Sequence, residues 1–122
     1  MSTPDSTLDR IRDALATVDD VVFYGTAAGL PESDPWDYTV FSREETRAKD
    51  NLTGFTNVYS VAMVRESYVP DGAAAEVIGA MTAIPGMRLD HGTAIGYYYT
   101  TKPGTKDVVE MMTLRFVKAV KS

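Results

Sequence analysis

Cysteine is absent from this 122-residue chain, which excludes both a disulfide framework and a thiolate metal site. Only one histidine is present, His91, and nothing in the sequence supplies a nucleophile to work with it. A surface or structural histidine beside Asp90 is therefore the preferred interpretation, and catalysis is the minor one. No Asp or Asn array has the spacing of a calcium loop. We expect no catalytic, cofactor-binding or metal-binding residue.

Long apolar runs and a positive net charge are also lacking. No apolar run approaches the roughly 20 residues of a membrane span, and the first residues lack the basic and apolar regions of a signal peptide. We therefore expect a soluble protein without a membrane partner. The net charge of -5 argues against a domain that grips nucleic-acid phosphates over a broad face. It is compatible with a surface that nucleic acid passes without sticking.

What is present is the composition of an ordinary globular protein, with 44% apolar and 24% charged residues. The length suits a single domain over residues 1–122. The apolar periodicity predicts an α+β fold, with a mostly antiparallel sheet and two helices in the order α-β-β-β-α-β-β. The expected elements are a helix from Ser6, strands over 21–26, 36–47 and 54–67, a helix within 70–86, and strands over 87–101 and 105–121.

The final strand has too much apolar surface for one cover. Its first face carries Val108, Met112, Leu114, Phe116 and Val120. Its second face is also mostly apolar and carries Val109, Met111, Thr113, Arg115, Val117 and Ala119. We expect a helix on one face and another layer or another subunit on the second. If the N-terminal helix covers the second face with its apolar stripe, this surplus disappears. That stripe consists of Leu8, Ile11, Leu15 and Val18.

Two further segments are candidates for contact with a partner. The charged run SREETRAKDN is expected to leave the core for solvent or to form a protruding loop, and its alternatives are a functional arm or a mobile, solvated hairpin end. In the run of three tyrosines, Tyr98 should face opposite to Tyr97 and Tyr99, so one face could meet a partner; core packing on one side and solvent on the other is the alternative. The candidate subunit or tube interface comprises Arg43, Glu44, Glu45, Arg47, Lys49, Asp50, Tyr97, Tyr99, Met111 and Arg115.

The arrangement of these segments resembles the tail terminator, or tail completion, proteins of lambda-like bacteriophages with long non-contractile tails. The resemblance covers most of the chain. It lies in the helix LDRIRDALATV, the strands VVFYG, WDYTVFSREETR and TGFTNVYSVAMVRE, the helix ending IPGMRL, and the closing pair ending MTLRFVKAV. The charged loop and the basic end KAVKS have no counterpart in this resemblance.

The resemblance implies a virion structural protein and not an enzyme. Such a protein forms a homo-hexameric ring on the major tail tube protein, ends tube polymerisation and offers the joining surface for a head-completion or connector protein. DNA passes through its channel without specific binding. The expected location is the head-proximal end of the tail, after assembly in the host cytoplasm.

Two alternatives stay open beside this reading. One is a head-closure or neck protein of the same connector. The other is a small ferredoxin-like ligand-binding domain or enzyme, with a pocket between sheet and helices that Trp36, His91, Tyr97 or Tyr99 would line.

Overall fold

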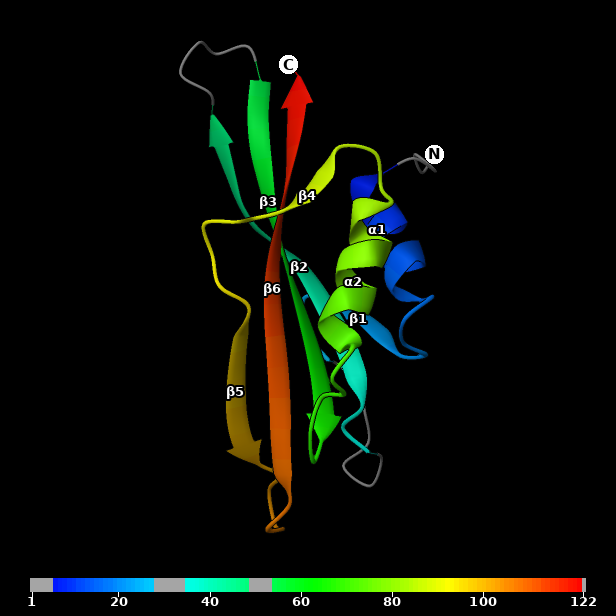
Figure 1. Ribbon diagram of the computed structural model, residues 1–122, viewed down its shortest axis with the longest axis vertical. Helices are drawn as coiled ribbons and strands as arrows, with labels where there is room; N and C mark the ends of the chain where they lie inside the picture. The colour runs from blue at the N-terminus through cyan, green and yellow to red at the C-terminus, as the bar shows by residue number, and fades with distance from the viewer. Residues whose placement is uncertain (1–5, 28–34, 49–53, 122) are drawn as a thin grey trace.

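The computed structural model describes residues 6–27, 35–48 and 54–121 and arranges them as one six-stranded sheet with two helices (Figure 1). This confirms the predicted α+β class and the two helices, but the described chain has one strand more than expected. The elements are α1 (Thr7–Leu15), β1 (Val22–Tyr24), β2 (Tyr38–Ala48), β3 (Gly54–Glu66), α2 (Ala73–Thr82), β4 (Met87–Leu89), β5 (Gly96–Thr101) and β6 (Val108–Lys121).

The sheet is mostly antiparallel, as expected. Its strand order is β1-β2-β3-β6-β4, and β5 also pairs with β6. Only the short pairing of β1 with β2 is parallel among the described strands. The strand β6 therefore lies inside the sheet, with β3 on one side and β4 and β5 following each other along its other side.

The extra strand arises because the segment 87–101 is not one continuous strand. It breaks after β4, where the Asp90 carboxylate accepts hydrogen bonds from Gly92 N at 3.1 Å and Thr93 Oγ1 at 3.0 Å. An Asp side chain that bonds backbone two residues further on closes a tight turn of its own. The predicted single strand was wrong for this reason, and His91 lies exposed in the resulting turn.

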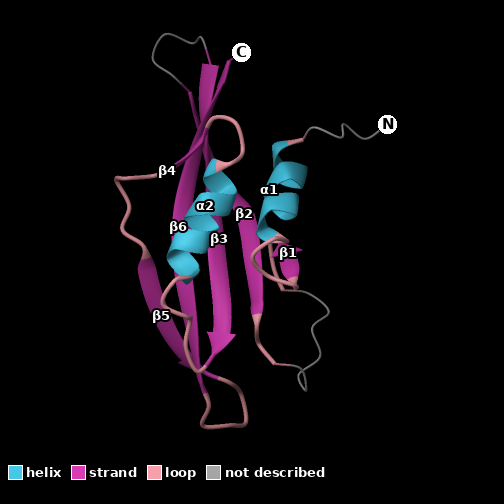
Figure 2. Ribbon diagram, turned by 45° about the vertical axis from the view of Figure 1, so that its right-hand side comes forward, coloured by secondary structure: helices cyan, strands magenta, loops and turns pink. Residues whose placement is uncertain are grey.

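Both helices pack on the same face of the sheet (Figure 2). Ile11 and Leu15 of α1 and Val77 and Met81 of α2 have no exposed surface. The strands contribute to the same core Phe41, Tyr59, Val61, Met63, Met112, Leu114 and Phe116. The apolar stripe of α1 therefore packs over β1 and β2 on the side of the sheet that carries the first face of β6, and the second face of β6 keeps its apolar surplus.

A buried ion pair fixes the chain where it leaves α1. The Asp19 carboxylate is 9% exposed; its Oδ2 lies 2.9 Å from Arg65 NH2 on β3 and accepts a hydrogen bond of 2.7 Å from Thr39 Oγ1 on β2. Its Oδ1 accepts from Val21 N at 3.3 Å. One carboxylate thus connects the end of α1 to the start of β1 and to two central strands.

At the other end of the molecule, β2, β3 and β6 run on beyond the helices as a projecting arm (Figure 1). The arm consists of Ser42–Ala48 on β2, paired with residues 55–60 of β3, whose own partners are residues 115–120 of β6. The side chains from Arg43 to Ala48 are all exposed. The predicted strand through Arg47 and its exit from the core into solvent are confirmed, and the alternative of a protruding loop does not hold over Arg43–Ala48. Backbone pairing with β3 satisfies this charged segment without burying its side chains.

Candidate interaction surface

The sheet face opposite the helices, here called the open face, is covered by none of the described residues outside the sheet and its flanking loops. The registers of the strands place on it Tyr38, Val40, Ser60, Ala62, Val64, Tyr98, Thr100, Val109, Met111, Thr113 and Arg115. It divides into two parts. The end near the β5–β6 turn is apolar, and the end toward the arm is charged.

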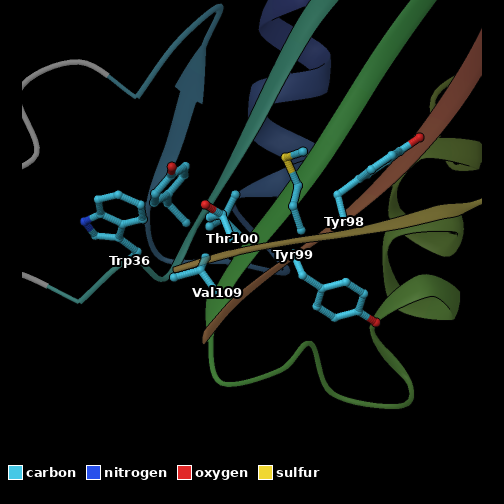
Figure 3. A pocket seen from close by; sticks show the side chains of 8 residues that line it. Trp36, Tyr98, Tyr99, Thr100 and Val109 are labelled. Carbon is cyan, nitrogen blue, oxygen red and sulfur yellow. The ribbon is translucent and has the colours of Figure 1, made fainter. Parts of the chain in front are cut away.

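The apolar half of the open face is hollowed. A groove of about 450 Å³ runs over β2 and β3, and its walls include Val40, Ala62 and Val64. A smaller cavity of about 250 Å³ adjoins it, lined by Trp36, Tyr38, Tyr98, Tyr99, Thr100, Val109 and Met111 together with Val64 (Figure 3). Both hollows share Trp36, Tyr38, Val64 and Met111, so they form one continuous apolar depression.

Trp36 is held at the rim of this depression by a small polar cluster. Its backbone N donates to Glu66 Oε1 at 3.0 Å, and Lys102 Nζ lies 2.6 Å from the same oxygen. The lysine nitrogen also sits 5.9 Å from the Trp36 ring centroid, within cation–π range. The hydrogen bond from Lys102, followed by that from Trp36 N, lowers the pKa of Glu66 below its ordinary value. These contacts hold the Trp36 backbone in place and put a cation beside its indole.

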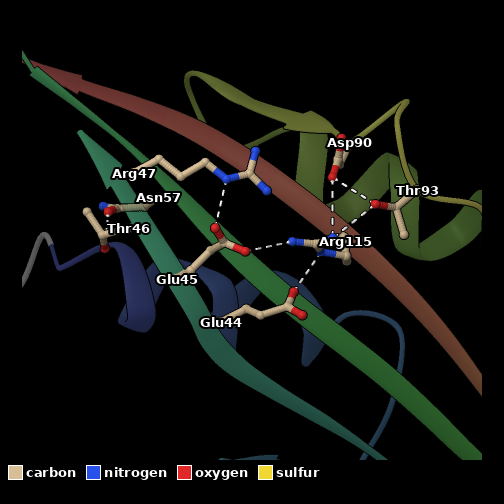
Figure 4. A network of polar contacts seen from close by, with 8 residues as sticks. All are labelled: Glu44, Glu45, Thr46, Arg47, Asn57, Asp90, Thr93 and Arg115. Carbon is tan, nitrogen blue, oxygen red and sulfur yellow. Dashed lines mark hydrogen bonds and ion pairs between the residues drawn. The ribbon is translucent and has the colours of Figure 1, made fainter. Parts of the chain in front are cut away.

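The charged half of the open face centres on Arg115 of β6 (Figure 4). Its NH2 donates to Glu45 Oε1 at 3.2 Å and its NH1 donates to Thr93 Oγ1 at 3.1 Å. Its Nε lies 2.7 Å from Glu44 Oε2, but the N–H does not point at that oxygen, so this contact is an ion pair without a hydrogen bond. Arg115 thus joins β2, β6 and the turn after β4.

Two neighbouring carboxylates, those of Asp90 and Glu45, have lowered pKa values, and Arg115 is one of the causes. Hydrogen bonds from Gly92 N and Thr93, with the positive charge of Arg115 as a further cause, lower the pKa of Asp90. The pKa of Glu45 is lowered chiefly by its hydrogen bond with Arg47, whose Nε lies 2.8 Å from Glu45 Oε2, and also by Arg115. Both carboxylates are therefore ionised at neutral pH, and the charged half is an ordered network of both signs.

The structure brings together some of the predicted interface residues and separates others. Glu44, Glu45, Arg47 and Arg115 form the charged half, and Met111 lies in the apolar half. Arg43 turns to the other side of the arm, where its Nε donates to Tyr24 Oη at 3.4 Å. Lys49 and Asp50 lie outside the described residues.

The three tyrosines alternate between the two faces of the sheet as predicted. However, the tyrosine that lies on the same face as Met111 is Tyr98, which the predicted interface residues do not include. Tyr98 is paired with Met111 in the β5–β6 register, whereas Tyr97 is paired with Met112 and Tyr99 with Glu110 on the helix-bearing side. In Figure 3 the Tyr98 and Tyr99 side chains leave β5 in opposite directions. The sequence-based set also omitted Val109, Asp90 and Thr93. The position of the turn at Pro103 and Gly104 was a usable signal for Tyr98, since it fixes which residues of the two strands face each other.

In the part of the chain that the structure describes, no group of three or more His, Asp or Glu side chains is arranged to hold a metal ion. None of the described helices is long and apolar enough to cross a membrane.

Comparison with known proteins adds little to this surface. No protein-family model matches the chain, and no curated protein matches it. Among the solved structures that match, one whose name states no function aligns at 17% identity over 94% of this chain and 96% of its own, with a TM-score of 0.40. A TM-score at that level does not establish a shared fold.

Proposed function

We propose that this protein is a structural subunit that assembles with copies of itself, and that it acts as a tail terminator of a long-tailed bacteriophage. The observation that carries self-assembly is the open face. Both helices pack on the opposite side of the sheet, so an apolar depression centred on Tyr38, Val64 and Met111 is left without a covering layer among the described residues. Exposed apolar patches of this kind commonly mark protein–protein contacts.

The division of the open face favours one fixed orientation of the partner. The apolar half can bury apolar surface of a neighbour. The charged half, with Glu44, Glu45 and Arg115, can form ion pairs with that neighbour that are lost when the neighbour is misplaced. The two ends of the face differ, so a neighbour that contacts it with a different surface makes a head-to-tail interface. Such interfaces close into rings when the rotation between subunits permits.

The assignment to a tail terminator rests on the resemblance in the order and character of the segments. In this proposal the ring, a homo-hexamer, sits on the major tail tube protein at the head-proximal end of the tail within the virion. It ends tube polymerisation and presents the joining surface for a head-completion or connector protein. The net charge of -5 suits a channel that DNA passes without specific binding. The role is structural and requires no catalysis.

Light scattering coupled to size-exclusion chromatography, together with negative-stain images, tests the assembly. Met111→Glu places a charge in the apolar depression and should reduce the molar mass of the assembled species to that of one chain. Val108→Glu is the matched control, because Val108 is an apolar residue of the same strand that is 49% exposed and faces away from the depression. A strictly monomeric wild-type protein at high concentration, also with tail tubes added, would refute self-assembly.

A second candidate is binding of a small molecule in the 250 Å³ cavity, because Trp36, Tyr38 and Tyr98 give it aromatic walls. The pocket expected between sheet and helices is filled by the buried core, so this candidate moves to the open face. A ligand-dependent rise in melting temperature across a metabolite panel, lost in Trp36→Ala, would favour small-molecule binding.

A head-closure or neck protein is the alternative function most similar to that of a tail terminator. Joining assays with purified tails distinguish these two functions.

A further inference from the structure

The outer edge of β5 has the features of a strand that accepts another strand. Lys102 N donates to Asp107 O at 3.0 Å, which sets the hydrogen-bonding phase of the β5–β6 pair. Because this phase repeats every two residues, Thr100 and Tyr98 direct their backbone groups toward β6. Tyr97, Tyr99 and Thr101 direct theirs outward, and none of the described strands pairs with them.

Natural sheets protect outer edges with charges, prolines or bulges, and β5 has none of these. Its sequence is GYYYTT, and its register with β6 is uninterrupted. The free edge of the arm is the contrast within this molecule. There, Ser42–Ala48 contains four charged residues, and its pairing with β3 shifts register between Arg43 and Glu45, as at a bulge. The arm edge is protected and the β5 edge is not.

Hollows border β5 on both faces of the sheet, each on the side of its inner neighbour β6. On the open face, Tyr98 and Thr100 line the apolar cavity beside Val109. On the helix-bearing face, Tyr97 and Glu110 line a depression of about 580 Å³ together with Tyr68, Val69, Pro70, Asp71, Gly72, Ala74 and Ala75. Side chains of an added strand would alternate between the two faces of the sheet, and long side chains would reach across β5 into these two hollows.

The two hollows differ in chemistry. The first is apolar, whereas the second has a carboxylate at its floor. Glu110 is 9% exposed, and its Oε1 accepts from Val69 N at 2.6 Å. It also accepts from the Tyr99 hydroxyl, which raises the pKa of that tyrosine. No cation of the described residues lies within ion-pair distance of Glu110, and Arg65, its cross-strand neighbour on β3, pairs with Asp19 instead.

From these observations we propose that β5 binds an extended segment of a protein partner by strand addition, and that the segment alternates apolar and basic side chains. The backbone groups of Tyr97, Tyr99 and Thr101 hold the added strand. Its apolar side chains enter the open-face cavity beside Tyr98, and its basic side chains lie between the Tyr68 and Tyr97 rings and approach Glu110 and Asp71. A carboxylate bordered by aromatic rings is a favourable environment for an ammonium or guanidinium group. The backbone edge of β5 and the hollow around Glu110 lie outside the proposed subunit contact, whereas the cavity beside Tyr98 belongs to the same depression, so a subunit bound there would compete with the apolar side chains of the segment.

The probe is a fluorescein-labelled, end-capped peptide of alternating valine and lysine, six residues long, followed by fluorescence anisotropy. The control peptides are a block peptide of the same composition, with three valines before three lysines, and an alternating valine–serine peptide. We expect the alternating valine–lysine peptide to bind at least tenfold more tightly than the block peptide. Hydrogen exchange with mass spectrometry should show slowed exchange over residues 96–101 when it is bound.

Two variants test the backbone and the charge separately. Thr101→Pro removes an outward N–H that makes no bond to β6 and leaves the Tyr99 contact with Glu110 in place, so the fold should persist while peptide affinity falls about tenfold. Glu110→Gln keeps an acceptor for Val69 N and should weaken the valine–lysine peptide about fivefold, with no effect on the valine–serine peptide. Glu76→Gln, an exposed position on α2, is the matched loss of one negative charge and should change nothing.

Several results would overturn the proposal. These are equal affinity for the block peptide, unchanged binding in Glu110→Gln, and protection over the arm in place of β5. Slowed exchange of β5 without peptide at high protein concentration would show that a second copy occupies the edge, and this would also refute a partner strand.

Discussion

At the scale of single residues, Asp19 shows how one buried charge can hold three elements. It contacts Arg65, Thr39 and Val21 N, and the Arg65 side chain is only 18% exposed. Breaking a buried pair from one side leaves the other charge without compensation, which costs more than the pair itself contributes. The hydrogen bonds that Arg65 NH1 makes to the backbone oxygens of Val64 and Tyr38 would offset part of that cost.

Asp19→Ala should therefore lower the free energy of unfolding by about 3 kcal/mol in urea denaturation at neutral pH. Asp20→Ala is the control, since Asp20 is the exposed neighbour and its replacement should cost no more than about 0.5 kcal/mol. Equal losses in the two variants would mean that the ion pair does not hold the end of α1 in solution.

The residue scale also shows what the sequence could and could not predict about the surface. The alternation of the three tyrosines followed from the period of a strand and is confirmed. Which of them shares a face with Met111 depends on register, and register is decided by the turn closed between Lys102 and Asp107. The contact of Arg115 with Thr93 could not be predicted, because it depends on the break after β4 that the apolar pattern does not reveal.

At the scale of elements, the arm is the part whose sequence was most ambiguous. Its alternation predicted a strand as far as Arg47 while its charges left a protruding loop open, and pairing with β3 keeps it in the sheet as far as Ala48. Within the proposed function the arm contacts a neighbouring subunit or the tail tube, and its charged surface determines how well that contact fits.

Arg47→Glu tests this role of the arm. The Arg47 side chain is 52% exposed, so the melting temperature should stay within a few degrees of wild type. Tail joining should fall, because the reversed charge stands beside Glu45 and repels it as well as the partner. An in vitro complementation assay with tails that lack the protein measures the effect. Unchanged joining would exclude Arg47 from the interface.

At the scale of the whole molecule, the decisive fact is that both helices lie on one side of the sheet. An apolar stripe on a helix predicts that this side of the helix is buried, but it does not indicate which face of the sheet it covers. The sequence therefore left two outcomes for α1, and its packing on α2, β1 and β2 within the one core that also contains Leu114 and Phe116 decides between them.

If the apolar half dominates self-assembly, the complex should tolerate salt. Apolar burial does not weaken with ionic strength, while exposed ion pairs are largely screened at about 1 M salt. Light scattering should therefore give the same molar mass at about 0.05 M and about 1 M sodium chloride. Dissociation at high salt would assign the contact to the charged half around Arg115 and Glu44.

The position of β6 inside the sheet has a consequence for how the chain reaches its fold. This strand joins β3 to β4 and β5, yet it is the last of the eight helices and strands formed by the described residues. The other seven helices and strands leave the ribosome before β6 is made. One backbone edge of β3 therefore has no hydrogen-bonding partner until synthesis of β6 is complete. Such long-range pairing is slow, and an exposed strand edge is open to wrong partners meanwhile. A newly made chain is thus prone to wrong strand pairing from the completion of β3 to the completion of β6. The duration of this period is set by the rate of translation and not by the stability of the folded protein.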